Sequence, residues 1–205
     1  MDPNWAAENL QTIRTLMERS AIYRRALAPL MITVGAIGLA ASVFTCFQKI
    51  EQPKSFALFW MGVGLLAIAA TLVYVRRQAL KSAEAFWSSP TRRVTQALAP
   101  GFIVGLAAGV WFAQGGAGNA VWLLPLAWVV LYGCALTAAG FFVQRGIKLF
   151  GWGFIIGGMA LAFLAISTPK LQTAEAGHYV MGTFFGVLHL AYGGYLFFTE
   201  RKNET

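Results

Sequence analysis

Six long apolar stretches, separated by short polar segments, dominate the hydrophobic pattern from residue 26 onward. The first contains no charged residue between Ala26 and Gln48, and the second contains none between Ser55 and Val75. At a rise of ~1.5 Å per residue, each stretch can cross a hydrocarbon core of ~30 Å as an α-helix. The pattern therefore predicts an all-α fold, a polytopic bundle of six transmembrane helices.

The longest uncharged run has to be divided to fit this scheme. No residue between Val94 and Gln144 is charged, and such a run is too long for one span. The polar, glycine-rich segment 114–119 divides it, which predicts a tight helical hairpin. Within a transmembrane domain of residues 26–199, the expected spans cover about 27–47, 55–75, 97–113, 120–142, 149–168 and 178–199, and residues 200–205 form a charged tail.

Residues 1–25 follow a different pattern. Trp5, Leu10, Ile13 and Met17 recur at three- to five-residue spacing, and the charged residues mostly lie off this stripe. The segment predicts an amphipathic helix on the cytoplasmic membrane surface, although a straight cytoplasmic extension of the first span fits equally well. Because no short apolar segment with a cleavage site precedes the first span, we expect no cleaved signal peptide.

Composition and charge support the membrane class and add an orientation. The chain is 58% hydrophobic and only 12% charged, whereas soluble domains are about 25% charged. Its net charge of +8 does not indicate nucleic-acid binding, because the basic residues flank apolar runs. One side of the expected bundle holds 13 of the 16 Lys and Arg residues, so the positive-inside rule places both termini in the cytoplasm. Basic residues expected at the membrane surface, beside anionic lipid headgroups, are Arg24, Arg25, Arg76, Arg77, Arg92 and Arg93.

A short sequence repeat marks the start of the first and third spans. An Arg-Arg pair precedes Ala-Leu-Ala-Pro at residues 26–29 and again at 97–100, 71 residues later. A true duplication would relate spans one and two to spans three and four as parallel repeats. The alternative is that arginines followed by a proline in the first helical turn are a general way to enter a membrane. We favour the alternative, because the match weakens beyond these residues.

Glycines recur four residues apart within three of the expected spans. In lipid, such small-residue faces let helix backbones approach closely and are a main route to helix association. We expect them to pack the six helices into one bundle, with oligomerisation through one face as an alternative. They are Gly101, Gly105 and Gly109 in the third span, Gly153 and Gly157 in the fifth, and Gly182 and Gly186 in the sixth.

The two histidines of the chain are the candidate site residues at membrane depth. His189 lies mid-span, with Tyr192 and Tyr195 at three-residue steps after it, which predicts a hydrogen-bonded His–Tyr cluster and a candidate polar cavity. His178 lies about three turns earlier, so both rings are expected on a similar side of one helix, ~16 Å apart along its axis. This separation excludes a shared metal ion. We interpret His189 as structural, bonded to a tyrosine or a backbone carbonyl; haem ligation is a weaker alternative, because no third histidine exists for a bis-histidine site.

Other chemistry is not indicated. No Asp or Glu lies within an expected span, and proton pumps or intramembrane enzymes usually need titrating or paired side chains at depth. No phosphate-binding glycine loop is present. Cys46 and Cys134 are interpreted as small packing residues. Five tryptophans near span ends predict an interfacial belt, and these are Trp5, Trp60, Trp87, Trp122 and Trp152. We therefore expect no catalytic residues, no metal and no cofactor.

The run from Ile13 to Arg25 resembles the opening of an uncharacterised group of bacterial multi-span membrane proteins. The resemblance covers about the first thirty residues and implies a bacterial inner-membrane protein, with no activity attached.

These observations lead to three function hypotheses. The first is a non-catalytic structural or regulatory subunit of a membrane assembly, whose cytoplasmic segments contact a protein partner, another copy or anionic lipid. The second is a transporter or channel for a small uncharged or lipophilic solute, with a cavity near His189, Tyr192 and Tyr195. The third is a haem-binding membrane protein.

Overall fold

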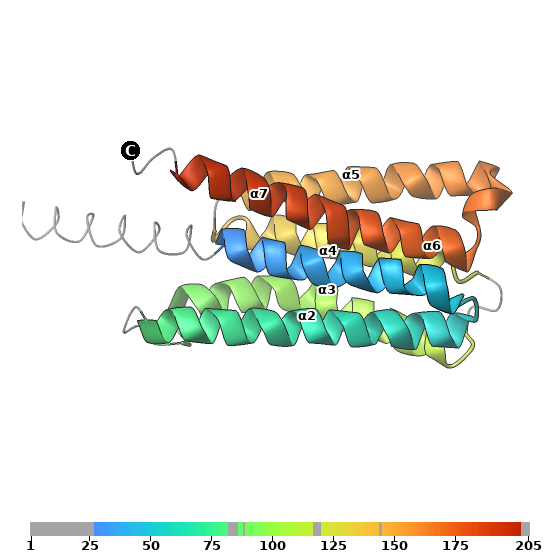
Figure 1. Ribbon diagram of the computed structural model, residues 1–205, viewed down its shortest axis with the longest axis horizontal. Helices are drawn as coiled ribbons and strands as arrows, with labels where there is room; N and C mark the ends of the chain where they lie inside the picture. The colour runs from blue at the N-terminus through green and yellow to red at the C-terminus, as the bar shows by residue number, and fades with distance from the viewer. Residues whose placement is uncertain (1–26, 82–85, 88, 117–119, 144, 202–205) are drawn as a thin grey trace, which may run out of the picture.

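The computed structural model of the chain describes residues 27–81, 86–87, 89–116, 120–143 and 145–201. Within these ranges the chain is helical and contains no strand, so the all-α prediction is confirmed. The helices lie side by side as an elongated bundle (Figure 1). They are the helix Leu27–Gln48, α2 (Pro53–Lys81), α3 (Ser89–Ala113), α4 (Leu123–Ala139), α5 (Arg145–Ser167), the 3-10 turn η1 (Pro169–Leu171), α6 (Ala174–Met181), the π-helical turn η2 (Gly182–Val187) and α7 (Leu188–Arg201).

Five of these helical stretches are long and apolar enough to span a membrane. They are Leu27–Gln48, Pro53–Lys81, Thr91–Ala113, Arg145–Ser167 and the continuous stretch Ala174–Thr199, which joins α6, η2 and α7. The expected fourth span, 120–142, is shorter in the structure, because α4 has 17 residues and covers only ~26 Å at ~1.5 Å per residue. The turn after α4 starts at Gly140, whose N–H still bonds to the Leu136 carbonyl.

The helix ends follow local sequence signals. The helix Leu27–Gln48 stops before Lys49, which has a φ of 46°, the left-handed conformation common directly after a helix. After α3, Gly115 adopts a φ of 85°, and glycine reaches this region without steric cost. The helix α3 thus ends where the glycine-rich segment 114–119 begins, and residues 117–119 of that segment lie outside the described residues. Residues 1–26 lie outside the described residues, so the amphipathic helix and Arg24-Arg25 remain predictions.

Glycines set the close approach between the helix Leu27–Gln48 and the α6–η2–α7 rod. A Cβ built on Gly186 would lie 2.9 Å from the Leu39 nitrogen, and one on Gly38 would lie 2.5 Å from the Phe185 carbonyl oxygen. A Cβ on Gly182 would collide with Ser42. Because the obstructing atoms are largely backbone, no larger residue fits without separating the helices.

The other predicted glycines divide into two groups. Gly101 faces Leu131 and Ala135, and Gly109 faces Met61 and Trp128, so these glycines do pack within the bundle. Gly105 and Gly157 also face neighbouring aromatic rings. Gly153 is the exception, because a Cβ built there would meet no atom within 4 Å. Its assignment to intrachain packing was wrong: α5 turns a different glycine, Gly151, toward α4.

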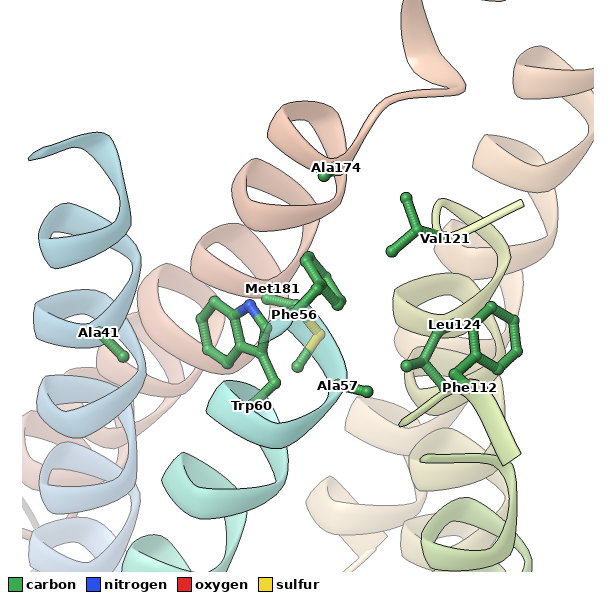
Figure 2. Packing of buried hydrophobic residues seen from close by; sticks show 9 residues of the cluster. All are labelled: Ala41, Phe56, Ala57, Trp60, Phe112, Val121, Leu124, Ala174 and Met181. Atoms are coloured by element: carbon green, nitrogen blue, oxygen red, sulfur yellow. The ribbon is translucent and has the colours of Figure 1, made fainter. Parts of the chain in front are cut away.

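Buried apolar side chains form three clusters along the bundle. The cluster in Figure 2 joins Phe56 and Trp60 of α2 to Met181 of α6, with Phe112 and Leu124 on the α3–α4 side. A second lies toward the end at which α5 starts and includes Met31, Leu136 and Leu196. The third, built on Val129, Phe154 and Phe184, connects α4, α5 and η2. Cys46 and Cys134 belong to none of them, since both are free and exposed, which corrects their interpretation as packing residues.

Candidate functional site

His189 is the most enclosed polar side chain at the predicted membrane depth. It lies at the start of α7 and is 0% exposed. Its Nε2 is 2.9 Å from the Tyr132 hydroxyl of α4, and its Nδ1 is 2.9 Å from the Phe184 carbonyl oxygen. Both ring nitrogens therefore have a partner, one a tyrosine hydroxyl and one a backbone carbonyl.

The backbone around η2 explains why the Phe184 carbonyl accepts a side-chain bond. In an α-helix the N–H of residue 188 would bond to the carbonyl of residue 184. In this chain the Leu188 N–H instead bonds to the Thr183 carbonyl, five residues back, as in a π-helix. The Phe184 carbonyl therefore does not accept from the Leu188 N–H, and it lies 2.9 Å from Nδ1 of the His189 ring. The widened turn and the buried histidine form one hydrogen-bonded unit.

The partners also determine the tautomer of His189. A carbonyl oxygen only accepts hydrogen bonds, so in the neutral ring Nδ1 carries the proton and donates to Phe184. Nε2 then accepts from the Tyr132 hydroxyl. Aromatic side chains enclose this unit, with ring centroids of Phe150, Phe154 and Phe185 between 5.2 and 6.0 Å from the imidazole.

His178, near the start of the α6–η2–α7 rod, also has a hydrogen-bond partner on each ring nitrogen, but the donor and acceptor roles of the two nitrogens are the reverse of those in His189. The Trp60 indole N–H donates to its Nδ1 at 2.9 Å, and its Nε2 is 2.8 Å from the Ile50 carbonyl oxygen. Since the indole can only donate, Nδ1 is unprotonated and Nε2 carries the proton. The Ser42 hydroxyl also donates to the His178 backbone carbonyl, at 3.1 Å. This network connects α6 to α2 and to the end of the helix Leu27–Gln48.

The two histidines do not share a side of the rod, which corrects the sequence expectation. His178 packs against Phe56 and Trp60 of α2, whereas His189 faces Tyr132 of α4 and Phe150 of α5. The expectation assumed an uninterrupted α-helix, in which eleven residues make about three turns. The π-helical turn adds a residue to one turn, so every later side chain is rotated by about one α-helical position, ~100°.

Tyr192 and Tyr195 do not join His189 in the way the three-residue spacing indicated. The tyrosine bonded to His189 is Tyr132, 57 residues away in the sequence. Tyr192 stacks on Phe150 at a centroid distance of 4.6 Å, and its buried hydroxyl has no hydrogen-bond partner among the described residues. Tyr195 is 63% exposed. The predicted polar group is therefore split. Only Tyr192 lies near His189, because it stacks on Phe150, whose ring also packs against His189.

Trp60 and Tyr132 are the residues that sequence reasoning missed. Trp60 was interpreted as part of an interfacial belt, yet it is buried and bonded to His178. Both are aromatic residues with one polar atom inside an apolar run, and such atoms usually find a partner when buried. That signal identifies them as candidates, but it does not say which histidine each contacts.

Neither histidine has a ring nitrogen free to bind a metal ion or a haem iron, because all four nitrogens have hydrogen-bond partners. Among the described residues, no group of three or more His, Cys, Asp or Glu side chains could hold a metal ion. A haem iron at His189 would have to displace either Tyr132 or the Phe184 carbonyl from its nitrogen. His178 would likewise have to lose Trp60 or Ile50. The imidazoles serve as hydrogen-bonding links between helices.

The predicted membrane-surface arginines within the described residues lie together at one end of the bundle. Arg76 and Arg77 stand in the last turns of α2, and Arg92 and Arg93 in the first turns of α3; all four are exposed. Arg145, at the start of α5, lies at the same end of the bundle (Figure 1). The opposite end holds the short connection from Lys49 to Gln52 and the turn η1.

No protein-family model, curated protein or solved structure matches the chain.

Proposed function

We propose that this chain is a six-span integral membrane protein without a catalytic centre of its own, which acts as a structural or regulatory subunit of a membrane assembly. In this proposal it lies in the inner membrane of a bacterium, with both termini in the cytoplasm. Its partners are a membrane protein or a second copy of the chain, together with anionic lipid headgroups.

One observation carries the non-catalytic role. The two histidines are the groups best suited to proton transfer or ligation at membrane depth. Each has both ring nitrogens in hydrogen bonds to another side chain or to a backbone carbonyl. His189 is sealed by three phenylalanine rings, and His178 lies between α2 and the end of the helix Leu27–Gln48. A general acid or base needs reach to a substrate proton. These arrangements favour rigidity over chemistry.

The arrangement of the helix ends supports the six-span topology. The end of α2 and the starts of α3 and α5 lie at one end of the bundle (Figure 1). This end carries the exposed arginines, and juxtamembrane basic residues attract anionic lipid by about 1 kcal/mol each. The apolar α4 then completes an even number of crossings, although it is short enough to require local thinning of the bilayer or tilt of its neighbours.

The first test is native mass spectrometry of the untagged protein extracted in mild detergent. The proposal expects partner subunits, or a second copy, in a fixed ratio. A bare monomer that retains a small organic ligand would contradict it and favour the transporter hypothesis.

A deletion variant then locates the contact. Removing residues 2–23 while keeping Arg24 and Arg25 preserves the orientation signal, and we expect it to release the partner subunit. Deletion of residues 202–205 is the matched control and should leave the complex intact. An unchanged complex after the N-terminal deletion would contradict a partner contact through this segment.

A further inference from the structure

We propose that the π-helical turn η2 is a register switch, which lets α7 rotate by one residue position relative to α6 and couples that rotation to the seat of the helix Leu27–Gln48. The inference rests on the geometry of the turn and holds whether or not the chain is a subunit of a larger assembly.

The π-helical turn η2 contains one residue more than an α-helical turn would. Its diagnostic bond runs from the Leu188 N–H to the Thr183 carbonyl, one residue further back than an α-helical bond. If the turn became α-helical, each later residue would take the place that its successor occupies now. Leu188 would replace His189 in the aromatic enclosure, and His189 would take the place of Leu190.

Two features hold the present register. The His189 ring bonds to the Phe184 carbonyl within the π-helical turn, and Tyr132 holds the ring from the other side. The place of Leu190 offers no such partners, because Leu190 lines an apolar surface groove of about 560 Å³ with Leu39, Ala40 and Val43. Moving a hydrogen-bonded imidazole to an apolar, lipid-facing groove is costly. His189 therefore holds α7 in its present register.

The second coupled part is the surface of α7 against which the helix Leu27–Gln48 packs. A Cβ built on Gly193 would lie 2.8 Å from Ile32 Cγ1 and 2.9 Å from the Ile32 nitrogen. In the α-helical register Tyr192 would occupy this place, where its ring cannot fit. The rotation thus requires the helix Leu27–Gln48 to move away from α7. Conversely, a partner or ligand that displaces this helix favours the rotated register.

The test replaces His189 and determines the register of α7 from the reactivity of cysteines placed in it. Tyr195 is 63% exposed and Leu196 is 6% exposed. In a Cys46→Ser/Cys134→Ala background, we expect Tyr195→Cys to react faster than Leu196→Cys with a small methanethiosulfonate reagent. Adding His189→Phe, which cannot bond and suits an apolar groove, should reverse this order. Phe198→Cys is the control, because position 198 would move to the exposed place of Thr199 and stay reactive.

A deletion distinguishes switching from general loosening. Removing Val187 from the His189→Phe protein takes out the extra residue, so the parent order of reactivity should return. A folded His189→Phe protein that keeps the parent order, or a deletion that fails to restore it, would overturn the proposal.

If His189→Phe does not fold, a pair of deletions in the parent sequence decides. Deleting Val187 should convert the turn to α-helix with α7 in its present register and leave the parent order of reactivity, with a modest loss of thermal stability because the His189 N–H then takes the Phe184 carbonyl that its ring bonds to now. Deleting Ala191, in regular α-helix, should disrupt both. Equal damage from the two deletions would count against the switch.

Discussion

At the residue scale, two neutral histidines with opposite tautomers hold the rod α6–η2–α7 to its neighbours. His178 accepts from an indole and donates to a carbonyl through Nε2, whereas His189 donates to a carbonyl through Nδ1 and accepts from a phenol. Three of these bonds join the rod to another segment, and the fourth returns to the Phe184 carbonyl of the rod itself. Buried polar groups of this kind rigidify a bundle only when every member is satisfied.

The Tyr132 hydroxyl provides a direct test of such a link. Tyr132→Phe leaves Nε2 of His189 without its donor, and we expect the free energy of unfolding in mixed detergent micelles to fall by roughly 0.5–2 kcal/mol. Tyr195→Phe removes an exposed hydroxyl and should change it by less than ~0.5 kcal/mol. Equal effects of the two substitutions would show that the Tyr132–His189 bond contributes nothing.

At the element scale, glycine position decides which helices touch. The glycines of the helix Leu27–Gln48 and of the rod α6–η2–α7 oppose one another's backbones. The same spacing in α5 has only one inward member, since Gly157 meets Phe184 whereas Gly153 meets nothing within 4 Å. A four-residue glycine spacing therefore marks a flat face but not its orientation.

Alanine substitutions separate these two environments. Gly186→Ala forces a methyl group against the backbone of Leu39, and we expect a loss of roughly 1–3 kcal/mol in unfolding free energy. Gly153→Ala adds a methyl group in open space and should be neutral or stabilise by up to ~1 kcal/mol through helix propensity. Reversible unfolding in the same micelles measures both. A destabilising Gly153→Ala would instead indicate a contact with a second copy.

At the scale of the whole molecule, charge is distributed unequally between the two ends of the bundle. The α2–α3 end carries Arg76, Arg77, Arg92 and Arg93, and the opposite end carries Lys49 with few other basic residues. The positive-inside rule predicts that the arginine-rich end faces the cytoplasm.

Cysteine labelling in intact cells tests this orientation without altering the charge. In a cysteine-free background, Gln52→Cys should react with a membrane-impermeant maleimide added outside. Trp87→Cys, exposed at the other end, should react only after the membrane is permeabilised. The reverse pattern would place both termini outside.

The sequence by itself determined the helical class and the membrane character. Long uncharged apolar runs, glycine breaks and flanking arginines act locally, so the approximate positions of the long helices could be predicted. The interpretation of His189 as bonded to a tyrosine or a backbone carbonyl followed from the cost of an unpaired polar group in lipid, whereas the bond from Trp60 to His178 was not predicted. The 17-residue length of α4 did not follow, because its flanking residues are also apolar.

Only the tertiary structure decided the partners. Tyr132 lies 57 residues from His189, and Trp60 lies 118 residues from His178, so their pairing depends on which helix faces meet. The widened turn in the last span rotated every later side chain by about one position, and no apolar periodicity marks it in advance. Local chemistry therefore defines the helices, whereas packing between distant segments selects the face that each helix presents.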